Sequence, residues 1–341
     1  MTNKVIIIAE AGVNHNGDIN IAKRLVDAAA EAGVDYIKFQ TFKADALVSK
    51  EAKKADYQKE NTKNSNESQY EMLKKLELSE EQHQELIEYC SLKNINFFST
   101  AFDLKSLQYL KTIGLNIVKI PSGEITNLPY LRLASKLFEK IIISTGMCTM
   151  KEVKNAFDVF INNKIKKENI TILHCTTEYP TPMNEVNLKA MLHIQKELGT
   201  QIGYSDHTLG IEVPIAAVAL GAKVIEKHFT LDRLMNGPDH LASLEPNSLT
   251  EMVKSIRNIE LAIEGTGIKN PSKSEIKNIE IARKSIHVSK TIKKGDIILE
   301  DDLIMMRPGN GISPMELDQV VGKKSKIELV KGKIINWGDI L

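Results

Sequence analysis

The 341-residue sequence is poor in cysteine and has almost no net charge. Its three cysteines, Cys90, Cys148 and Cys175, are scattered and form no CxxC pair, which argues against a disulfide framework or structural zinc site and fits a reducing cytoplasm. A formal net charge of +1 gives no electrostatic reason to expect nucleic acid or a membrane surface as partner. No run approaches 18 consecutive apolar residues, and the run that begins at Val5 is too short for a signal-peptide core. We therefore expect a soluble, cytoplasmic protein.

Short β-branched runs alternate with longer amphipathic segments along most of the chain. Most of these runs are apolar throughout, as parallel strands buried on both faces require. No glycine-rich phosphate loop follows the first run, which disfavours an open doubly wound sheet. Eight strands that alternate with helices predict an α/β fold of the TIM (β/α)8 barrel type. The expected strands are 5–9, 35–39, 96–99, 117–120, 140–144, 170–174, 201–204 and 223–226.

The composition changes after the expected barrel, which we place at residues 1–265. Residues 266–282 are polar and lysine-rich and predict a linker. The short elements in 283–341 predict a small, turn-rich β domain that would have only a marginal core by itself. Between the second and third expected strands, 43–66 is a polar excursion and 67–76 an extra helix. Such an insertion is either a substrate loop or functionally neutral, and the sequence favours neither.

Polar residues stand where the expected strands end, and the ends of barrel strands converge on one pocket. Two of them are histidines, His207 and His228. Each by itself would more often be a satisfied structural histidine, but together they could hold a divalent metal with open positions. That arrangement suits Mn²⁺, Mg²⁺ or Co²⁺ better than structural zinc.

Two lysines, Lys38 and Lys119, interrupt apolar strands. A buried lysine is costly unless it meets an anion, and two ammonium groups beside several hydroxyls suit a phosphate next to a carboxylate. Two alternatives stay open: an ion pair with a barrel carboxylate such as Glu10 or Glu124, or a Schiff-base lysine as in some barrel aldolases. The two nearby histidines weaken the Schiff-base alternative.

Several short motifs occur in a fixed order along the chain. They are IAEAGVNHNG at 8–17, KFQT at 38–41, SGE at 122–124, STGM at 144–147, YPTP at 179–182, SDHT at 205–208, EKHFT at 226–230, GPD at 237–239 and RPGNG at 307–311. Together they resemble the sialic acid synthase (nonulosonate synthase) family over the whole chain. The resemblance implies a TIM barrel followed by an antifreeze-like (SAF, β-clip) domain, in a swapped homodimer where the small domain of one chain covers the barrel mouth of the other. Family members condense phosphoenolpyruvate with an N-acylated six-carbon amino sugar, giving a nine-carbon 2-keto acid and phosphate.

Carried over by position, the resemblance implies three groups of site residues. The divalent metal, with Mn²⁺ expected first, would bind to His207 and His228. The phosphate and carboxylate of phosphoenolpyruvate would be bound by Lys38, Lys119, Ser122, Ser144 and Ser205. The sugar would be bound by Glu10, Gln40, Tyr179, Asp239, either Asn64 or Asn66, and Arg307 from the partner chain. Glu10 and Glu124 would be catalytic beside the histidines, Glu124 by helping to activate the attacking water.

Two departures from the family pattern bear on the sugar. Members that make sialic acid usually carry histidines where this chain has Phe39 and Phe42, and many carry asparagine in place of Thr177. Both changes look more like the legionaminic acid synthases, whose sugar is 2,4-diacetamido-2,4,6-trideoxymannose. Two phenyl rings would make a drier pocket, provided that they face it. N-acetylmannosamine, and thus an N-acetylneuraminate synthase, is the alternative; a non-enzymatic alternative is a carbohydrate- or ice-binding module on a degenerate barrel.

Overall fold

A computed structural model describes residues 4–62 and 67–341. The chain folds into two compact units that divide between Glu264 and Gly265. None of the helices in the described ranges is long and apolar enough to cross a membrane. Asn64 and Asn66, the two asparagines expected to contact the sugar, lie outside the described residues.

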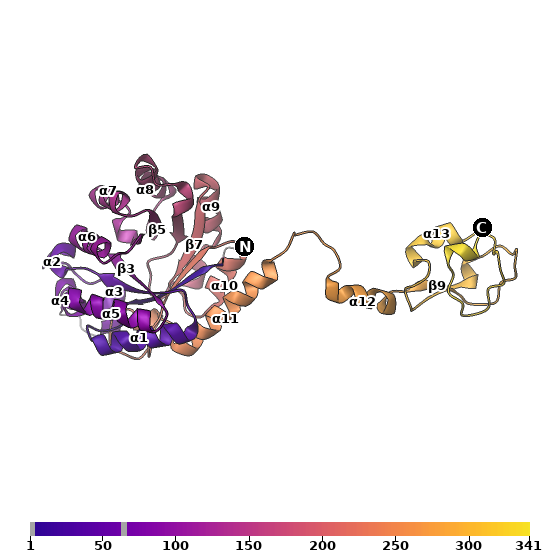
Figure 1. Ribbon diagram of the computed structural model, residues 1–341, viewed down its shortest axis with the longest axis horizontal. Helices are drawn as coiled ribbons and strands as arrows, with labels where there is room; N and C mark the ends of the chain where they lie inside the picture. The colour runs from indigo at the N-terminus through magenta and orange to yellow at the C-terminus, as the bar shows by residue number, and fades with distance from the viewer. Residues whose placement is uncertain (1–3, 63–66) are drawn as a thin grey trace. The chain divides into compact units, whose positions relative to one another are not determined.

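The first unit is a closed barrel of eight parallel strands in sequential order, in which β8 pairs back with β1. Figure 1 shows the strands inside a ring of helices. The predicted fold class is confirmed, and all eight strands form where the sequence predicts them. Several strands run further at their carboxyl ends than expected, so that the last strand carries one of the two histidines. The strands are β1 (Ile6–Gly12), β2 (Tyr36–Thr41), β3 (Asn96–Ala101), β4 (Ile117–Ile120), β5 (Lys140–Ser144), β6 (Ile170–His174), β7 (Gln201–Asp206) and β8 (Val224–His228).

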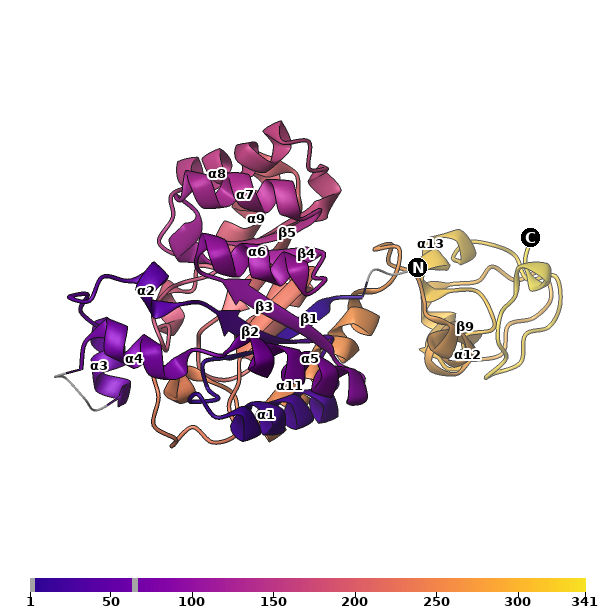
Figure 2. The same ribbon diagram turned by 60° about the vertical axis from the view of Figure 1, so that its left-hand side comes forward.

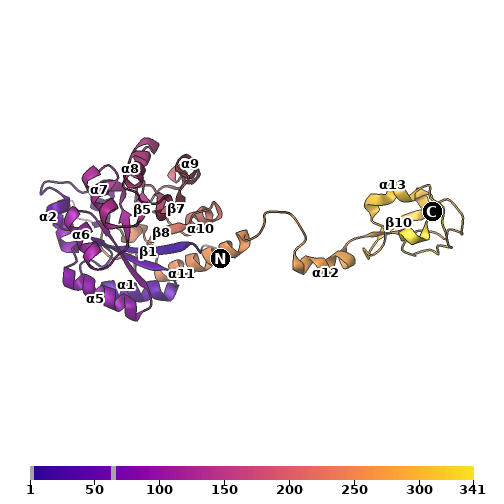
Figure 3. The same ribbon diagram turned by 45° about the horizontal axis from the view of Figure 1, so that its top comes forward.

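Helices surround the barrel, and neighbours in the ring pack on one another, as α1 does on α11 and α7 on α8 (Figure 3). The first helix shows why they begin and end where they do. Asp18 accepts a hydrogen bond from the Asn20 backbone N–H at its start, and Gly33 ends it at φ +75°. The helices of this unit are α1 (Ile19–Ala32), α2 (Ala44–Leu47), α3 (Asp56–Thr62), α4 (Gln69–Leu76), α5 (Glu80–Leu92), α6 (Leu104–Thr112), α7 (Leu128–Leu137), α8 (Met150–Asn162), α9 (Lys189–Leu198), α10 (Glu212–Ala219) and α11 (Pro246–Ile263).

The inside of the barrel is layered. Because side chains alternate along a strand, inward-facing positions recur every second residue and stack in layers. One layer is apolar and buried: Ile8, Phe98, Ile142, Leu173 and Val224. Two residues further along the same strands, the next layer is polar: Glu10, Thr100, Ser144, Cys175 and Glu226. A layer of buried apolar side chains thus closes the floor of the barrel, and the layer directly above it contains ionisable side chains.

The excursion after β2 folds into the three short helices α2, α3 and α4, which lie on the same side of the barrel (Figure 2). Met72 and Leu76 of α4 pack with Val13 and Phe42 in an apolar cluster of their own. The excursion is polar in composition, but its helices still turn an apolar face inward.

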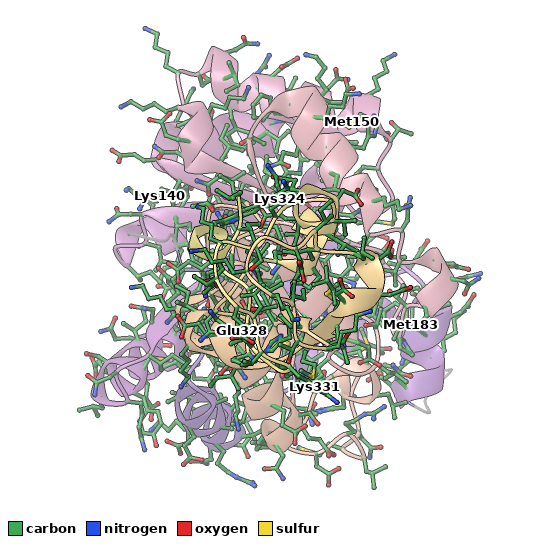
Figure 4. All side chains as sticks on the ribbon, turned by 90° about the vertical axis from the view of Figure 1, so that its right-hand side faces the viewer. Lys140, Met150, Met183, Lys324, Glu328 and Lys331 are labelled. Atoms are coloured by element: carbon green, nitrogen blue, oxygen red, sulfur yellow. The ribbon has the colours of Figure 1, made fainter. Side chains whose placement is uncertain are left out.

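The second unit contains helix α12 (Lys273–Ala282), which falls in the segment expected to be a linker, and a small domain. In that domain, β9 (Ser285–Val288) pairs antiparallel with β10 (Leu303–Met306), and α13 (Leu317–Val320) is its one short α-helix among the described residues. Its core consists of Ile286, Val288, Ile292, Ile298, Ile312, Val320, Leu329, Ile335 and Ile340. Charged side chains such as Lys324, Glu328 and Lys331 are exposed on its surface (Figure 4). The predicted small, turn-rich β domain is confirmed.

Candidate active site

The polar layer of the barrel opens into a cavity of about 160 Å³ at the carboxyl ends of the strands. Most residues that sequence reasoning assigned to the site meet here. Those lining the cavity are Glu10, Lys38, Gln40, Lys119, Ser122, Ser144, Tyr179, Ser205, His207 and His228. The lining also includes residues without a predicted role, chiefly Glu226, Thr100, Phe102, Met147 and Cys175.

Four buried charges form the base of the cavity. The Lys38 ammonium lies 2.7 Å from a Glu10 carboxylate oxygen and 3.6 Å from Glu226, and Lys119 donates to Glu226 at 2.7 Å. Lys38 also donates to the Thr100 hydroxyl at 2.8 Å. Two lysines and two carboxylates therefore hold one another in place at the base of the cavity, where a ligand would bind.

The two carboxylates differ in their proton affinity. Burial raises the pKa of the Glu10 carboxyl, although Lys38 opposes the shift. Burial would also raise the pKa of Glu226, but the charges of Lys119 and Lys38 outweigh it and lower that pKa. Glu226 is thus the fixed anion of the cluster, and Glu10 is the carboxyl that takes up a proton more readily.

Glu226 is the main residue that sequence reasoning missed. Of the alternatives weighed for the lysines, the Lys38–Glu10 ion pair occurs, but Lys119 pairs with Glu226 rather than with Glu10 or Glu124. The expected eighth strand ended at residue 226, which hid its inward position. The two-residue spacing from His228 was the signal that could have revealed it, because alternate residues share a face.

Three serines supply hydroxyl groups around the charges. Ser205 donates to Glu226 at 2.9 Å, and the Ser122 hydroxyl accepts from the Gly146 backbone N–H at 2.9 Å. In the part of the chain that the structure describes, the buried Ser144 hydroxyl has no hydrogen-bond partner. A buried hydroxyl that lines a cavity without a partner is a natural contact for a ligand oxygen.

The two histidines face each other across one side of the cavity, with ring centres 5.4 Å apart. His207 uses Nδ1 to donate to the Thr176 carbonyl, which leaves Nε2 as the free lone pair. Burial lowers the pKa of His207 to about 4 and that of His228 well below its usual value, so both rings are neutral, as metal ligands must be. The buried Nδ1 of His228 has no hydrogen-bond partner among the described residues.

This arrangement fits a divalent metal held by two imidazoles. With a nitrogen–metal distance of about 2.1 Å, each ring centre would lie roughly 3.2 Å from the ion, which a separation of 5.4 Å between ring centres allows. Within residues 4–62 and 67–341, no three His, Cys, Asp or Glu side chains are grouped so that they could hold a metal. The remaining positions of such an ion would be left for substrate or water.

A second, larger cavity of about 280 Å³ adjoins the first and shares Gln40, Phe102, Tyr179 and His228 with it. Its polar side includes Asp239, and burial raises the pKa of that carboxyl to about 7. Its apolar side comes from Val13 and the excursion, with Phe42, Leu47, Val48, Met72, Leu73 and Leu76. We call these excursion residues the apolar wall.

The two phenylalanines considered for the sugar pocket behave differently. Phe42 lines the second cavity and belongs to the apolar wall. Phe39 is fully buried in the main core and stacks on Phe97 with ring centres 5.9 Å apart. Only one of the two rings therefore faces the pocket, because Phe39 alternates with Lys38 and Gln40 and points to the other side of the strand.

An aromatic stack closes the side of the cavity next to the histidines. The Tyr179 ring lies 4.1 Å from the His207 ring and 5.5 Å from the His228 ring, measured between centres. Tyr57 of α3 stacks on the other side of Tyr179 at 5.0 Å, and Asn61 of the same helix donates to the Pro238 carbonyl at 2.6 Å. The excursion is thereby attached to the mouth of the barrel.

Glu124 has a predicted role but does not line either cavity. Glu124 is half-buried in a 3₁₀ turn (Ser122–Glu124), and its carboxylate accepts from the Asn127 side chain at 2.6 Å. Among the described lining residues, Glu226 is the ion-pair partner of Lys119 that Glu124 was considered for. Arg307 belongs to the second unit, where it is exposed and donates to the Ala282 carbonyl at 2.9 Å.

Gly12 sets the width of the site next to the histidines. It follows a register shift at the end of β1 and has φ +55°, a conformation that residues with a Cβ rarely adopt. A Cβ there would lie 3.3 to 3.4 Å from Glu10, Gln40 and His228. Only glycine leaves the space between these three side chains free.

Comparison with known proteins matches this geometry to one family. Residues 25–269 match the NeuB family and residues 283–341 match the SAF domain. The chain is 56% identical over 320 residues to an N,N'-diacetyllegionaminic acid synthase from Campylobacter jejuni, which covers 94% of this chain and 95% of the relative. It is 49% identical to a Legionella pneumophila protein of the same name, over 98% of this chain and 94% of the relative.

A solved structure agrees with the sequence relatives. The N-acetylneuraminic acid (sialic acid) synthetase from Leptospira borgpetersenii superposes with a TM-score of 0.70 at 36% identity, covering 82% of this chain and 91% of that one. The fold, the ordered motifs and these matches lead to one conclusion: the chain is an enzyme of the NeuB family, built as a TIM barrel followed by a SAF domain.

Proposed function

We propose that this enzyme condenses phosphoenolpyruvate with 2,4-diacetamido-2,4,6-trideoxymannose and water, giving N,N'-diacetyllegionaminate and phosphate. The observation that carries the proposal is the meeting of two buried lysines and two neutral imidazoles in one cavity. The names of the relatives at 56% and 49% identity support the choice of product.

Phosphoenolpyruvate would bind to the lysine half of the cavity. Its phosphate and carboxylate would be held by Lys38, Lys119, Ser122, Ser144 and Ser205. The fixed anion Glu226 keeps both ammonium groups oriented. These donors are already in position, so the site does not have to reorganise during the reaction. Electrostatic stabilisation by such preorganised groups is usually the largest single contribution to catalysis.

The sugar would bind between the histidines and the apolar wall. Gln40, Tyr179, Asp239 and Glu10 would contact its polar groups, and Phe42 would face its apolar substituents. A divalent metal held by His207 and His228, with Mn²⁺ as first choice, would act as a Lewis acid on the sugar's aldehyde oxygen. Holding the two substrates in line could itself supply several kcal/mol of the rate enhancement.

The atoms balance as follows. C3 of phosphoenolpyruvate forms a bond to the aldehyde carbon, water adds to C2, and the C–O bond to phosphate breaks. The nine-carbon product thus keeps the water oxygen at C2, and phosphate leaves with the former bridging oxygen. Lys38 and Lys119 would stabilise the charge that develops on the phosphate.

The same reasoning leaves N-acetylmannosamine as the second candidate sugar, favoured by the sialic acid synthetase among the structural neighbours. Phosphate release measured with each sugar, in the presence of Mn²⁺, decides between them. The proposal expects higher kcat/KM with the trideoxy sugar, and no release with any N-acyl aminohexose would contradict it. Treatment with borohydride in the presence of substrate should give no covalent adduct. A Schiff-base aldolase, in contrast, would form one.

The metal role has its own test. His207→Ala and His228→Ala should each abolish turnover and weaken Mn²⁺ binding, while the chain stays folded, because both rings contact the cavity and not the apolar layer. Unchanged activity in either variant would reject the assignment.

We further propose that the enzyme works in the cytoplasm as a swapped homodimer, with a barrel domain at 1–265, a linker at 266–282 and a SAF domain at 283–341 whose Arg307 completes the partner's site. Three free cysteines fit a reducing compartment. Arg307→Ala and Lys119→Met would each be inactive alone. Mixed by co-expression they should recover about a quarter of wild-type activity, since half of randomly paired dimers would contain one intact site. No recovery would show that the two domains act within one chain.

A further inference from the structure

A further buried ion pair, outside the cavity, lies behind the two histidines on the outer face of the barrel wall. Asp206 of β7 and Lys227 of β8 are register partners, and their charged atoms are 2.6 Å apart with both side chains fully buried. Ser205 and Glu226, their neighbours in sequence, line the cavity. Because side chains alternate along a strand, Asp206 and Lys227 point away from the cavity.

This pair is tied to the backbone on both sides of His207. The Lys227 ammonium also donates to the Thr208 carbonyl. Asp206 accepts from the Thr208 backbone N–H at 3.0 Å and from its hydroxyl at 2.9 Å. The network therefore links the residues before and after His207 to the residue before His228.

Stability alone does not account for two charges at this position. A buried ion pair is often no more stabilising than apolar residues of similar volume. The preceding outward-facing register partners, Tyr204 and Ile225, belong to the apolar core between barrel and helices. Apolar residues thus pack well between barrel and helices one layer below. The ion pair occurs at the strand ends, directly before His207 and His228.

We infer that the Asp206–Lys227 ion pair is a positioning device that fixes the two imidazoles relative to each other for the metal. This inference rests on the proposed metal site. The pairing of the two strands ends at these two residues, and the ion pair with its hydrogen bonds to Thr208 extends the constraint to the backbone that follows His207. Groups that hydrogen-bond to a metal ligand typically change metal affinity about 10- to 100-fold when removed, and we expect an effect of this order from a pair that acts on both ligands through the backbone of Thr208 and the two strand ends.

The test is a double variant, Asp206→Leu/Lys227→Met, which replaces both charges with apolar side chains and leaves no unpaired buried charge. Mn²⁺ affinity is measured by the electron paramagnetic resonance signal of free Mn²⁺, without turnover. We expect an unfolding temperature close to that of the wild type and Mn²⁺ binding about 10- to 100-fold weaker. Lys227→Met alone should bind Mn²⁺ weakly as well. It also leaves a lone buried carboxylate, so its unfolding temperature should be lower than that of the double variant.

Two controls separate positioning from general damage. Phosphoenolpyruvate binding, measured by calorimetry without metal, reports on the lysine half of the same cavity and should change less than threefold. Ile225→Val alters outward packing one layer below and should leave Mn²⁺ affinity unchanged. A folded double variant with Mn²⁺ affinity within threefold of the wild type would overturn the inference, and so would an equal loss of phosphoenolpyruvate and Mn²⁺ affinity.

Failure of the proposed function would look different. If wild-type protein binds no Mn²⁺, or if His207→Ala and His228→Ala bind it as tightly as the wild type, the metal site itself is wrong and the inference falls with it. If the histidine variants lose Mn²⁺ and the double variant does not, only the positioning role is wrong.

Discussion

The two cavities at the barrel mouth are built from different parts of the chain and have opposite character. The smaller one is charged, and its lysines and carboxylates come from β1, β2, β4 and β8. The larger one has an apolar side, and all of that side except Val13 is the apolar wall from the excursion after β2. In the proposed function, the strands carry the groups that bind phosphoenolpyruvate, and the insertion carries groups that would choose the sugar.

The difference also reflects rigidity. Each charge of the smaller cavity sits on a strand paired on both sides, so its position is fixed by the barrel. The apolar wall sits on the short helices α2 and α4 and on residues beside α2, in an excursion whose helix α3 contacts the mouth through Tyr57 and Asn61. A change in the charged cavity should therefore affect turnover with every sugar, whereas a change in the apolar wall should affect one sugar relative to another.

Among the changes that test this comparison, the largest effect is expected from Lys119→Met. This variant removes a charge aimed at the phosphate, and loss of one such donor typically costs about 10²- to 10³-fold in kcat. Steady-state kinetics with either sugar should show the same fall. Lys140→Met is the matched control, because this lysine is exposed at the opposite end of the adjacent strand β5 (Figure 4). A loss confined to one sugar would break the comparison.

Gly12→Ala should have the next largest effect on activity. The φ of +55° costs roughly 1–2 kcal/mol for a residue with a Cβ, and the new methyl group crowds Glu10, Gln40 and His228. We expect both a lower unfolding free energy and lower kcat/KM. Gly33→Ala has a similar φ of +75° but open space around its Cβ, so it should lose stability and keep its activity. Equal activity of the two variants would contradict the crowding.

Phe42→His should change the choice of sugar. It places a polar ring in the apolar wall, so the ratio of kcat/KM for the trideoxy sugar to that for N-acetylmannosamine should fall by about 10-fold, the size expected for one hydrophobic contact. Phe39→His is the control, since Phe39 is in the core and should lower stability without moving the ratio. A shift of the ratio by Phe39→His and not by Phe42→His would reverse our assignment of the two rings.

The smallest effect concerns a histidine that belongs to neither cavity. Burial lowers the pKa of His15 to about 4, below the usual value of about 6.5. The unfolded chain therefore binds the proton more readily, and stability is lost as pH falls below about 6.5 towards 4. We expect about 2 kcal/mol less unfolding free energy at pH 5 than at pH 7 from this residue. Denaturant titration of wild type and His15→Gln should show a weaker pH dependence in the variant.

The sequence allowed the barrel, its strands and most lysine, serine and histidine positions to be predicted, because buried parallel strands leave a clear apolar pattern. Glu226 was missed because the expected strand ended at that residue, although its spacing from His228 placed it inward. The roles of Phe39 and Phe42 could not be separated, since Phe42 lies just beyond β2, where alternation no longer applies. Helices α2 and α3 were not predicted because the excursion is polar and each helix is too short for a helical period to stand out.

The residues outside the cavity show another limit. Glu124 follows a serine–glycine turn that suits an anion, but the turn directs its carboxylate to Asn127. That direction depends on local geometry that no spacing rule contains. Arg307 lies in the second unit, and its role depends on assembly, which the sequence indicates only through resemblance.

The most direct test of the account follows the bridging oxygen of phosphoenolpyruvate. The enzyme is given phosphoenolpyruvate labelled with ¹⁸O at the bridging position, the trideoxy sugar and Mn²⁺, and the released phosphate is analysed by mass spectrometry. The account predicts that phosphate carries the label, because water adds at C2 and the C–O bond breaks. Unlabelled phosphate would contradict it.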